Sequence, residues 1–277
     1  MNKEIYFHVG LAKTGSTFLQ KNFFPYLKNI KYISTHDYIN CIDIINKTNY
    51  KSYLISREFD KQFEREIKKF ISYFPNTKII VVFRRHDKWI ASQYKRSVKN
   101  GWHWDFKDYY NINNKGIWKN SDLTYMNKLK IIQKYSKSKP LVLKFEGLRI
   151  NPFKYFDKIC NYTNSKYSKS QISLNIVHKS YNEKQLILLK KFCKIFKKTP
   201  PTYYDYQEIT LDKTIRNKNR IKHWLLYRPW WLLFHLVMYT SLLIPKSLIV
   251  KNSLINKNDL AEIKNKFKED WKKVFKY

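Results

Sequence analysis

The sequence predicts an α/β fold in which a central, mostly parallel sheet is flanked by helices. Three short apolar runs, residues 5–9, 78–83 and 141–145, are typical of strands buried on both faces. Segments with the apolar spacing of helices alternate with such strands, as in parallel sheets. At 277 residues, with 43% apolar and 17% aromatic residues, the chain is long enough for one sizeable core. We therefore expect a single three-layer domain over residues 1–277.

The first predicted strand, turn and helix occupy residues 4–24. The turn holds two glycines, Gly10 and Gly15, with Lys13 between them, and the run that follows is amphipathic. Glycines let the backbone approach an oxyanion closely, and the N-terminus of a helix favours negative charge. This segment therefore predicts a phosphate or sulfate site.

The turn departs from the phosphate loop of nucleotide triphosphatases, G-x-x-x-x-G-K-[ST]. Gly10, Gly15 and Thr17 fit that pattern. Ser16 stands where the lysine should be, and the cation lies inside the loop at Lys13. The pattern favours a phosphate-bearing donor other than a magnesium-bridged triphosphate. The alternative is an ordinary glycine turn between a strand and a helix.

A second predicted strand ends in cations. Residues 78–83 lead directly into Arg84 and Arg85, and a helix is predicted over residues 88–99 with Ser92 about one turn inside it. Arginine is scarce in this lysine-rich chain, and its planar fork suits bidentate binding of phosphate. Arg84 and Ser92 are therefore placed to hold a single phosphate.

Together these two motifs resemble those of the sulfotransferases that use 3′-phosphoadenosine-5′-phosphosulfate (PAPS), in particular bacterial carbohydrate sulfotransferases with a P-loop fold. The family's K-[ST]-G-[ST]-[ST] stretch, which binds the 5′-phosphosulfate, matches residues 13–17 position by position. Its strand-terminal arginine, followed by serine eight residues later, matches Arg84 and Ser92 as ligands of the 3′-phosphate. A weaker likeness is residues 142–152, which resemble the strand and turn that the family carries after its central helices. The resemblance covers residues 1–165.

The resemblance implies transfer of a sulfuryl group from PAPS as co-substrate, without a metal. In that mechanism Lys13 is also catalytic, because it stabilises charge on the bridging oxygen of the departing nucleotide. The family often places a further donor-binding cation near Arg216, although the G-x-x-R form is absent here. The implied donor-binding residues are Lys13, Thr14, Gly15, Ser16, Thr17, Arg84, Ser92 and Arg216. An ATP-using phosphotransferase and a non-catalytic basic protein that binds membranes or polyanions are the alternatives.

The catalytic base is predicted to be Glu58 or a histidine. Residues 53–56 have the composition of a strand, and Glu58 follows at its carboxyl end, the edge of an open α/β sheet where ligands bind. Carbohydrate sulfotransferases tend to carry their catalytic glutamate on such a segment. The alternative makes Glu58 a first-turn residue of the next helix. Among the histidines, His36 and His103 are the rival candidates and His103 is the one predicted as a site residue, whereas His8 in the first strand is interpreted as a core residue.

Aromatic residues gather between Gly101 and Trp118. Because sugar rings stack on aromatic faces, this segment is a candidate acceptor platform. The alternative is a hydrophobic loop that covers the sheet. Together with the resemblance, the segment predicts a carbohydrate or a glycolipid as the acceptor.

The remaining elements are predicted from apolar spacing. A short strand is expected at residues 31–34. Helices are expected at residues 59–74, 126–135, 152–162, 183–198 and 259–277.

The net charge of +34 is extreme. A protein with this charge could bind nucleic acid, an anionic membrane surface, or a polyanionic substrate or donor. The lysines are spread along the chain, which favours a compositional bias for most of the charge. No nucleic-acid motif accompanies them, and we predict no nucleic-acid partner.

Residues 220–252 contain an apolar segment that departs from the pattern of a plain soluble enzyme. Its uncharged run, residues 229–245, is shorter than the ~20 residues that span a bilayer, and spanning is not predicted. Tryptophans and tyrosines, with Arg228 and Lys246 beside them, instead predict a segment in the headgroup region of an anionic membrane surface. A core helix pair or an oligomer contact is the alternative.

The cysteines and the N-terminus bear on the compartment. Cys41, Cys160 and Cys193 are odd in number and far apart, and fit neither a zinc site nor a disulfide framework. The first strand begins by Glu4, which leaves no room for a signal peptide. We therefore expect a cytoplasmic protein, peripheral at the inner face of the membrane.

Overall fold

The computed structural model contains a five-stranded sheet in the order β2-β3-β1-β4-β5, with every neighbouring pair parallel. The structure describes residues 3–175, 180–196, 211, 220–250 and 252–276. The predicted α/β fold is confirmed. The strands are β1 Glu4–Gly10, β2 Lys31–Ile33, β3 Ser52–Glu58, β4 Lys78–Phe83 and β5 Leu141–Lys144.

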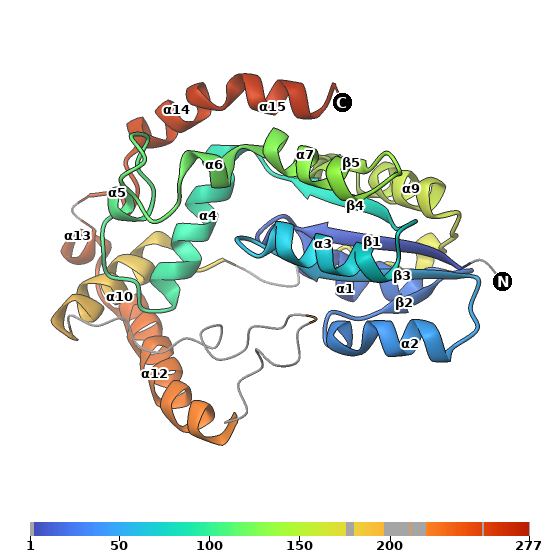
Figure 1. Cartoon of the computed structure of the whole chain (residues 1–277). Helices are drawn as coiled ribbons and strands as arrows, with labels where there is room; N and C mark the ends of the chain where they lie inside the picture. Colours follow the sequence, from blue (N-terminus) through green and yellow to red (C-terminus); the bar gives the residue numbers. More distant parts are fainter. Residues whose placement is uncertain (1–2, 176–179, 197–210, 212–219, 251, 277) are drawn as a thin grey trace.

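Helices connect the strands and continue after the last of them (Figure 1). The α-helices are α1 Ser16–Asn22, α2 Cys41–Lys47, α3 Phe63–Tyr73, α4 His86–Lys99, α5 Phe106–Tyr109, α6 Asn120–Leu123, α7 Tyr125–Tyr135, α8 Phe145–Ile150, α9 Pro152–Thr163, α10 Glu183–Phe196, α12 Arg220–Thr240, α13 Lys246–Ile249, α14 Lys257–Lys266 and α15 Lys268–Val274. Short 3₁₀ turns are η1 Phe24–Tyr26, η2 Tyr38–Asn40, η3 Lys169–Gln171 and η5 Ser241–Leu243.

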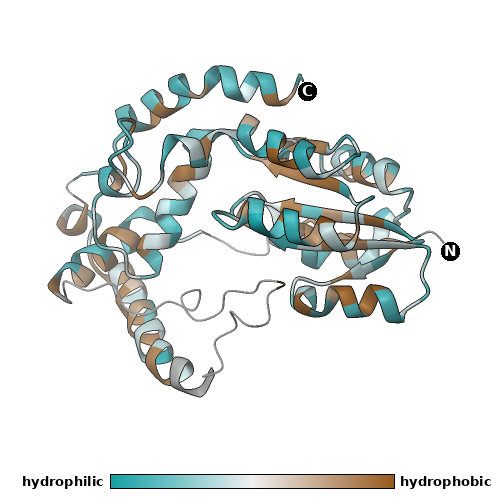
Figure 2. Cartoon of the chain, in the orientation of Figure 1, coloured by the Kyte–Doolittle hydropathy of each residue, from teal (hydrophilic) through white to brown (hydrophobic). Residues whose placement is uncertain are grey.

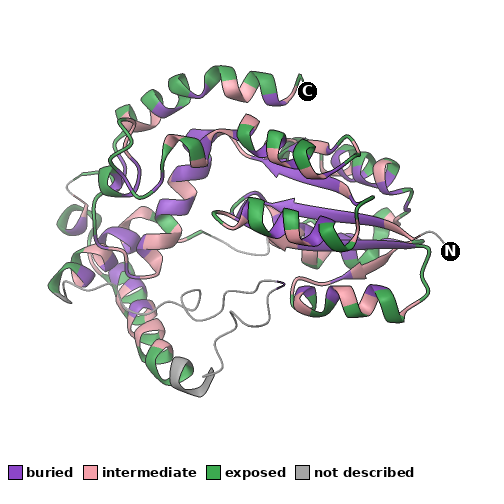
Figure 3. Ribbon diagram, viewed as in Figure 1, coloured by how far each residue is buried: buried purple, intermediate pink, exposed green. Residues whose placement is uncertain are grey.

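The alternation of side chains along the strands divides the core into two layers. Phe7 and Val9 of β1 pack on one face of the sheet with residues of α3, α4 and α7. Tyr6 packs on the other face with residues of α1 and α9. Strands β1, β3 and β4 are accordingly buried along most of their length, whereas the edge strands β2 and β5 are mostly half-buried (Figures 2 and 3). This arrangement confirms the three-layer architecture.

Two of the predicted boundaries are wrong. Strand β3 continues through Glu58, and α3 begins only at Phe63, so Glu58 is not a first-turn residue of a helix. The reason is tertiary, because Glu58 is the last residue of β3 paired in register with β1. The helix predicted over residues 259–277 is two helices, α14 and α15, which are separated at Phe267 where the backbone leaves helical geometry. The ring of Phe267 stacks on His86, at 4.7 Å between centroids, and packs into the core.

The aromatic segment at residues 101–118 mostly faces inward. Phe106, Tyr109, Tyr110 and Trp118 are buried in the core on the α4 side of the sheet. Trp104 is the exception, at 51% exposure. The structure therefore favours the covering loop over a broad aromatic platform.

Helices α12 and α13 lie beyond the carboxyl ends of the strands, whereas α14 and α15 pack against α4 and α7 (Figure 1). Helix α12 packs on α10, and α10 packs on α4. Phe234 and Met238 of α12 are buried, so one side of this helix belongs to the core. None of the described helices is both long enough and apolar enough to cross a membrane.

Candidate functional site

The loop from Gly10 to Thr17, called here the anion loop, joins the carboxyl end of β1 to α1. Two of its residues have positive φ angles, 70° at Lys13 and 86° at Gly15. A Cβ atom on Gly15 would also lie 2.9 Å from the ring of Phe145. Only glycine fits that position without strain. The predicted strand, turn and helix are therefore present, and the turn has a geometry that an ordinary residue would not maintain.

The other glycine of the loop makes room for a hydroxyl group. A Cβ on Gly10 would lie 2.2 Å from the Oγ of Ser16. Ser16 is fully buried and begins α1, so its hydroxyl lies directly over the end of β1. Glycine at position 10 and serine at position 16 thus form one packed unit.

The amide groups of the anion loop are free to bind an anion. In the part of the chain that the structure describes, the N–H groups of residues 13–17 donate no hydrogen bond to a protein atom. Successive unpaired N–H groups at a helix N-terminus form a site for phosphate or sulfate. The hydroxyl of Thr14 instead donates to the carbonyl of Leu11 at 2.6 Å, so the Thr14 side chain holds the loop together.

A clamp that the sequence did not reveal fixes the start of the loop. Asp60 accepts hydrogen bonds from the Ala12 N–H and from Gln93 Nε2, each at 3.1 Å. Its other oxygen accepts from Arg96 at 3.1 Å. The indole N–H of Trp89 donates to the Ala12 carbonyl at 2.8 Å. Both polar groups of Ala12 are therefore bonded, and α4 crosses the loop rather than running back along the sheet.

Glu58 lies beside the anion loop. The register of β1 and β3 pairs Glu58 with Gly10, the first residue of the loop. Burial, followed by the charge of Asp60, raises the pKa of Glu58, whereas Arg96, Ser16 and Lys13 act in the opposite direction. A carboxylate of raised pKa at the edge of an anion site is suited to accept a proton.

Cations converge on the same loop. Partial desolvation lowers the pKa of Lys13, and the charges of Arg96, Lys99 and Arg84 lower it further, opposed by Glu58. The guanidinium of Arg84 donates to the Lys13 carbonyl at 3.1 Å. This concentration of positive charge around unpaired amides favours an anion with more than one negative group.

Arg84 is held at the end of β4 by aromatic neighbours. Its guanidinium lies 4.8 Å from the centre of the Phe145 ring, and its carbonyl accepts the hydroxyl of Tyr125 at 2.6 Å. Glu146, which follows Phe145 in the chain, accepts a hydrogen bond from the Arg85 N–H at 3.1 Å. The Oε2 of Glu146 is buried without a partner among the described residues. Residues 142–152 thus form β5 and the short helix α8, where a strand and turn were expected. Phe145 and Glu146 were missed as site residues, although Phe145 is the last residue of the predicted strand and Glu146 follows it.

The other predicted site residues are less closely connected. Ser92 lies on α4 between Trp89 and Arg96, which both contact the loop region, but no hydrogen bond joins it to Arg84 among the described residues. His103 follows α4, stacks on Trp104 at 5.1 Å, and has no described contact with Glu58 or Lys13. Arg216 lies outside the described residues.

Two other histidines have clear surroundings. His36 is exposed after β2. His8 is fully buried, and its Nδ1 lies 2.8 Å from the hydroxyl of Ser56. Burial lowers the pKa of His8 to about 3. His8 is therefore a neutral core residue, as expected, although its Nε2 has no described partner.

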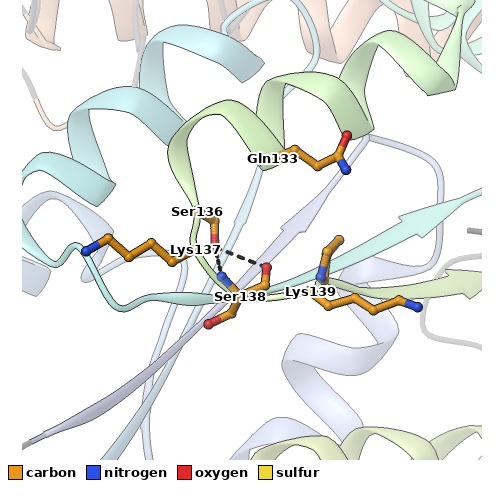
Figure 4. A pocket seen from close by; sticks show the side chains of 6 residues that line it. Gln133, Ser136, Lys137, Ser138 and Lys139 are labelled. Atoms are coloured by element: carbon orange, nitrogen blue, oxygen red, sulfur yellow. Dashed lines mark hydrogen bonds between the residues drawn. The ribbon is translucent and has the colours of Figure 1, made fainter.

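One surface hollow lies away from this site. It measures about 420 Å³ and lies between the end of α7 and the start of β5 (Figure 4). Ser136 in this hollow donates to the carbonyl of Thr77, just before β4 begins. The hollow is thus at the amino ends of the strands, opposite to the anion loop. Within the described ranges, no group of three or more His, Cys, Asp and Glu residues is arranged to hold a metal ion.

The fold and the loop define the chain as an α/β protein with a candidate anion site between a strand and a helix and a carboxylate beside it. No family model and no curated protein matches the sequence. Among solved structures, the chain is similar to a sulfotransferase from Alicyclobacillus acidocaldarius, at 13% identity over 66% of this chain and 87% of that one, with a TM-score of 0.48.

Two further structures were crystallised with PAP. One is a mouse sulfotransferase complexed with PAP, at 11% identity over 95% of this chain and 89% of that one, with a TM-score of 0.44. The other is retinol dehydratase in complex with androsterone and inactive cofactor PAP, at 11% identity over 87% of this chain and 82% of that one, with a TM-score of 0.38. These are distant likenesses, and the function proposed below rests on the residues of the site.

Proposed function

We propose that the protein is a sulfotransferase that moves a sulfuryl group from PAPS to a hydroxyl of a carbohydrate or glycolipid. The observation that carries this proposal is the anion loop itself. Its unpaired amides, the cation Lys13 within it, and Arg84 bonded to the Lys13 carbonyl stand next to the carboxylate of Glu58. The loop therefore combines a site for phosphosulfate with a base.

The donor fits the groups that the chain presents. The amides of residues 14–17 and the hydroxyls of Ser16 and Thr17 would hold the 5′-phosphosulfate. Arg84 and Ser92 would hold the 3′-phosphate, with Arg216 as a further cation. When bound, the donor supplies the sulfuryl group and a nucleotide phosphate as leaving group.

In the proposed reaction Glu58 accepts the proton of the acceptor hydroxyl. The acceptor oxygen forms a bond to sulfur while the bond from sulfur to the bridging oxygen of the nucleotide breaks. Lys13 stabilises the negative charge that develops on that bridging oxygen. The raised pKa of Glu58 suits this role because it makes the carboxylate a stronger base. His103 remains the alternative base.

The acceptor and the compartment are proposed on separate grounds. Exposed Trp104, near the end of α4, offers one aromatic face on which a sugar could stack. The thiols of Cys41, Cys160 and Cys193 are free and buried, which supports the cytoplasm. An anionic membrane surface is the second proposed partner, and α12 is the element that would meet it.

Calorimetric titration tests the donor assignment. PAP, which is adenosine 3′,5′-bisphosphate, is the product that PAPS becomes after transfer, and it would be compared with ATP. We expect PAP to bind more tightly than ATP to the wild type, and Lys13→Ala to weaken PAP binding. Lys21→Ala, an exposed lysine in the last turn of α1, is the matched control and should bind PAP as the wild type does. Tighter binding of ATP would favour a phosphotransferase instead.

A further inference from the structure

The outward side of α12 is apolar. Four of its exposed residues recur at helical spacing, and between 56% and 66% of each is exposed. Hydrophobic residues recur along this helix in Figure 2, and the same helix carries exposed residues in Figure 3. The four, called here the docking face, are Leu225, Leu232, Leu236 and Tyr239.

The inward side of the same helix is apolar as well. Phe234 and Met238 are buried against the core, half a helical turn away from the docking face. A helix that is apolar all round is normally buried all round, and an exposed apolar stripe of this length marks an interaction surface. The docking face therefore needs an apolar partner.

The charges around the docking face indicate which partner. The sequence has no aspartate or glutamate between Asp212 and Asp259, while lysines and arginines recur in that stretch. Arg228 is exposed on α12 itself, and Lys246 is exposed at the start of α13. Trp224 is exposed near the start of the helix. Basic residues and aromatic rings flanking an apolar stripe are complementary to the headgroup region of anionic lipids.

The docking face is connected to the anion loop through α4. Lys99, the last residue of α4, lines a small pocket with Trp230, Trp231 and His235 of α12. The same helix carries Trp89, which holds the loop at Ala12. The surface that would contact lipid and the loop that would bind the donor are thus placed on one packed unit.

We propose that the docking face of α12 binds the surface of an anionic bilayer, with the helix lying in the headgroup region. Docking places α4 and the anion loop near the lipid headgroups. That the acceptor is itself carried by the membrane rests on the proposed sulfotransferase function, whereas docking does not.

Co-sedimentation of the full chain with lipid vesicles tests docking. Vesicles of phosphatidylcholine with phosphatidylglycerol should bind the wild type, vesicles of phosphatidylcholine alone should bind it weakly, and added salt should reduce the binding. Leu232→Ser/Leu236→Ser removes two exposed side chains and should lower the partition coefficient by about tenfold. The matched control is Tyr73→Ser/Leu174→Ser, which removes two exposed apolar side chains elsewhere and should bind as the wild type does.

Titration with PAP separates this inference from the proposed function. Unchanged PAP binding by Leu232→Ser/Leu236→Ser would show that the variant is folded. Failure of the wild type to bind anionic vesicles, or equal binding by this variant, would overturn docking. A dimer that the variant abolishes, without vesicle binding by the wild type, would assign the face to a second copy of the chain. Vesicle binding without PAP binding would sustain docking and overturn the donor site.

Discussion

Asp60 offers the most informative perturbation of the site, because it holds the start of the anion loop. Its carboxylate accepts three hydrogen bonds, from Ala12 N–H, Gln93 and Arg96, each at 3.1 Å. The ion pair with Arg96 is mostly buried, with 15% of the Asp60 side chain and 23% of the Arg96 side chain exposed. Removing the carboxylate would leave the Ala12 N–H unbonded and would remove the partly buried ion pair with Arg96.

Asp60→Ala should therefore lower the free energy of unfolding by about 3 kcal/mol. Breaking a buried ion pair typically destabilises by about 3–5 kcal/mol, and the partial exposure of this pair favours the lower end. Urea unfolding followed by circular dichroism would measure the change. Because the loop would also loosen, PAP affinity should fall by about tenfold, an effect of about 1.4 kcal/mol.

Asp259→Ala is the matched control for this prediction. Asp259 pairs with Lys107 at 3.8 Å, and 70% of the Lys107 side chain is exposed, so the loss should stay within about 1 kcal/mol. The control should leave PAP affinity unchanged. Equal losses of stability in the two variants, or an unchanged PAP affinity in Asp60→Ala, would refute the role of Asp60 as a clamp of the loop.

Two further predictions concern pH. Burial and Asp60 raise the pKa of Glu58 above its ordinary 4.5, so its contribution to stability is complete below pH 4.5 and declines as pH rises through the raised value. In Glu58→Gln this decline should be absent when the midpoint of urea unfolding is measured as a function of pH. The same pH profile in Glu58→Gln and in the wild type would contradict the raised pKa of Glu58. Burial lowers the pKa of His8 from 6.5 to about 3, so stability should fall by about 1.4 kcal/mol for each pH unit from 6.5 down to 3. His8→Gln should remove this loss of stability in acid. An equal loss of stability with falling pH in the wild type and in His8→Gln would contradict the lowered pKa of His8.

The elements that hold the site were predictable because their signals are local. Gly10, Gly15 and Lys13 lie within one turn of the chain, and the apolar run before Arg84 indicates a buried strand without knowledge of its neighbours. The sequence placed Glu58 at the carboxyl end of a strand but did not identify the residue that lies beside it. Its pairing with Gly10 depends on the order of the strands, which apolar spacing does not report.

The clamp could not be predicted from the sequence. Asp60 and Arg96 are far apart in the chain, and they meet because α4 crosses the anion loop after β4. Periodicity places Trp89 and Arg96 on one side of a helix but does not say what that side contacts. The break at Phe267 has the same kind of cause, since the packing of its ring on His86 is a tertiary contact.

The most direct test of the proposed function compares PAP with AMP, which lacks the 3′-phosphate, on the wild type and on Arg84→Ala by calorimetry. If Arg84 binds the 3′-phosphate, the wild type should prefer PAP to AMP, and Arg84→Ala should lose most of that preference while binding AMP nearly as before. Lys88→Ala, an exposed cation in the first turn of α4, should retain the preference. A wild type that binds PAP no better than AMP, or a preference that survives in Arg84→Ala, would contradict the assignment of a PAPS site.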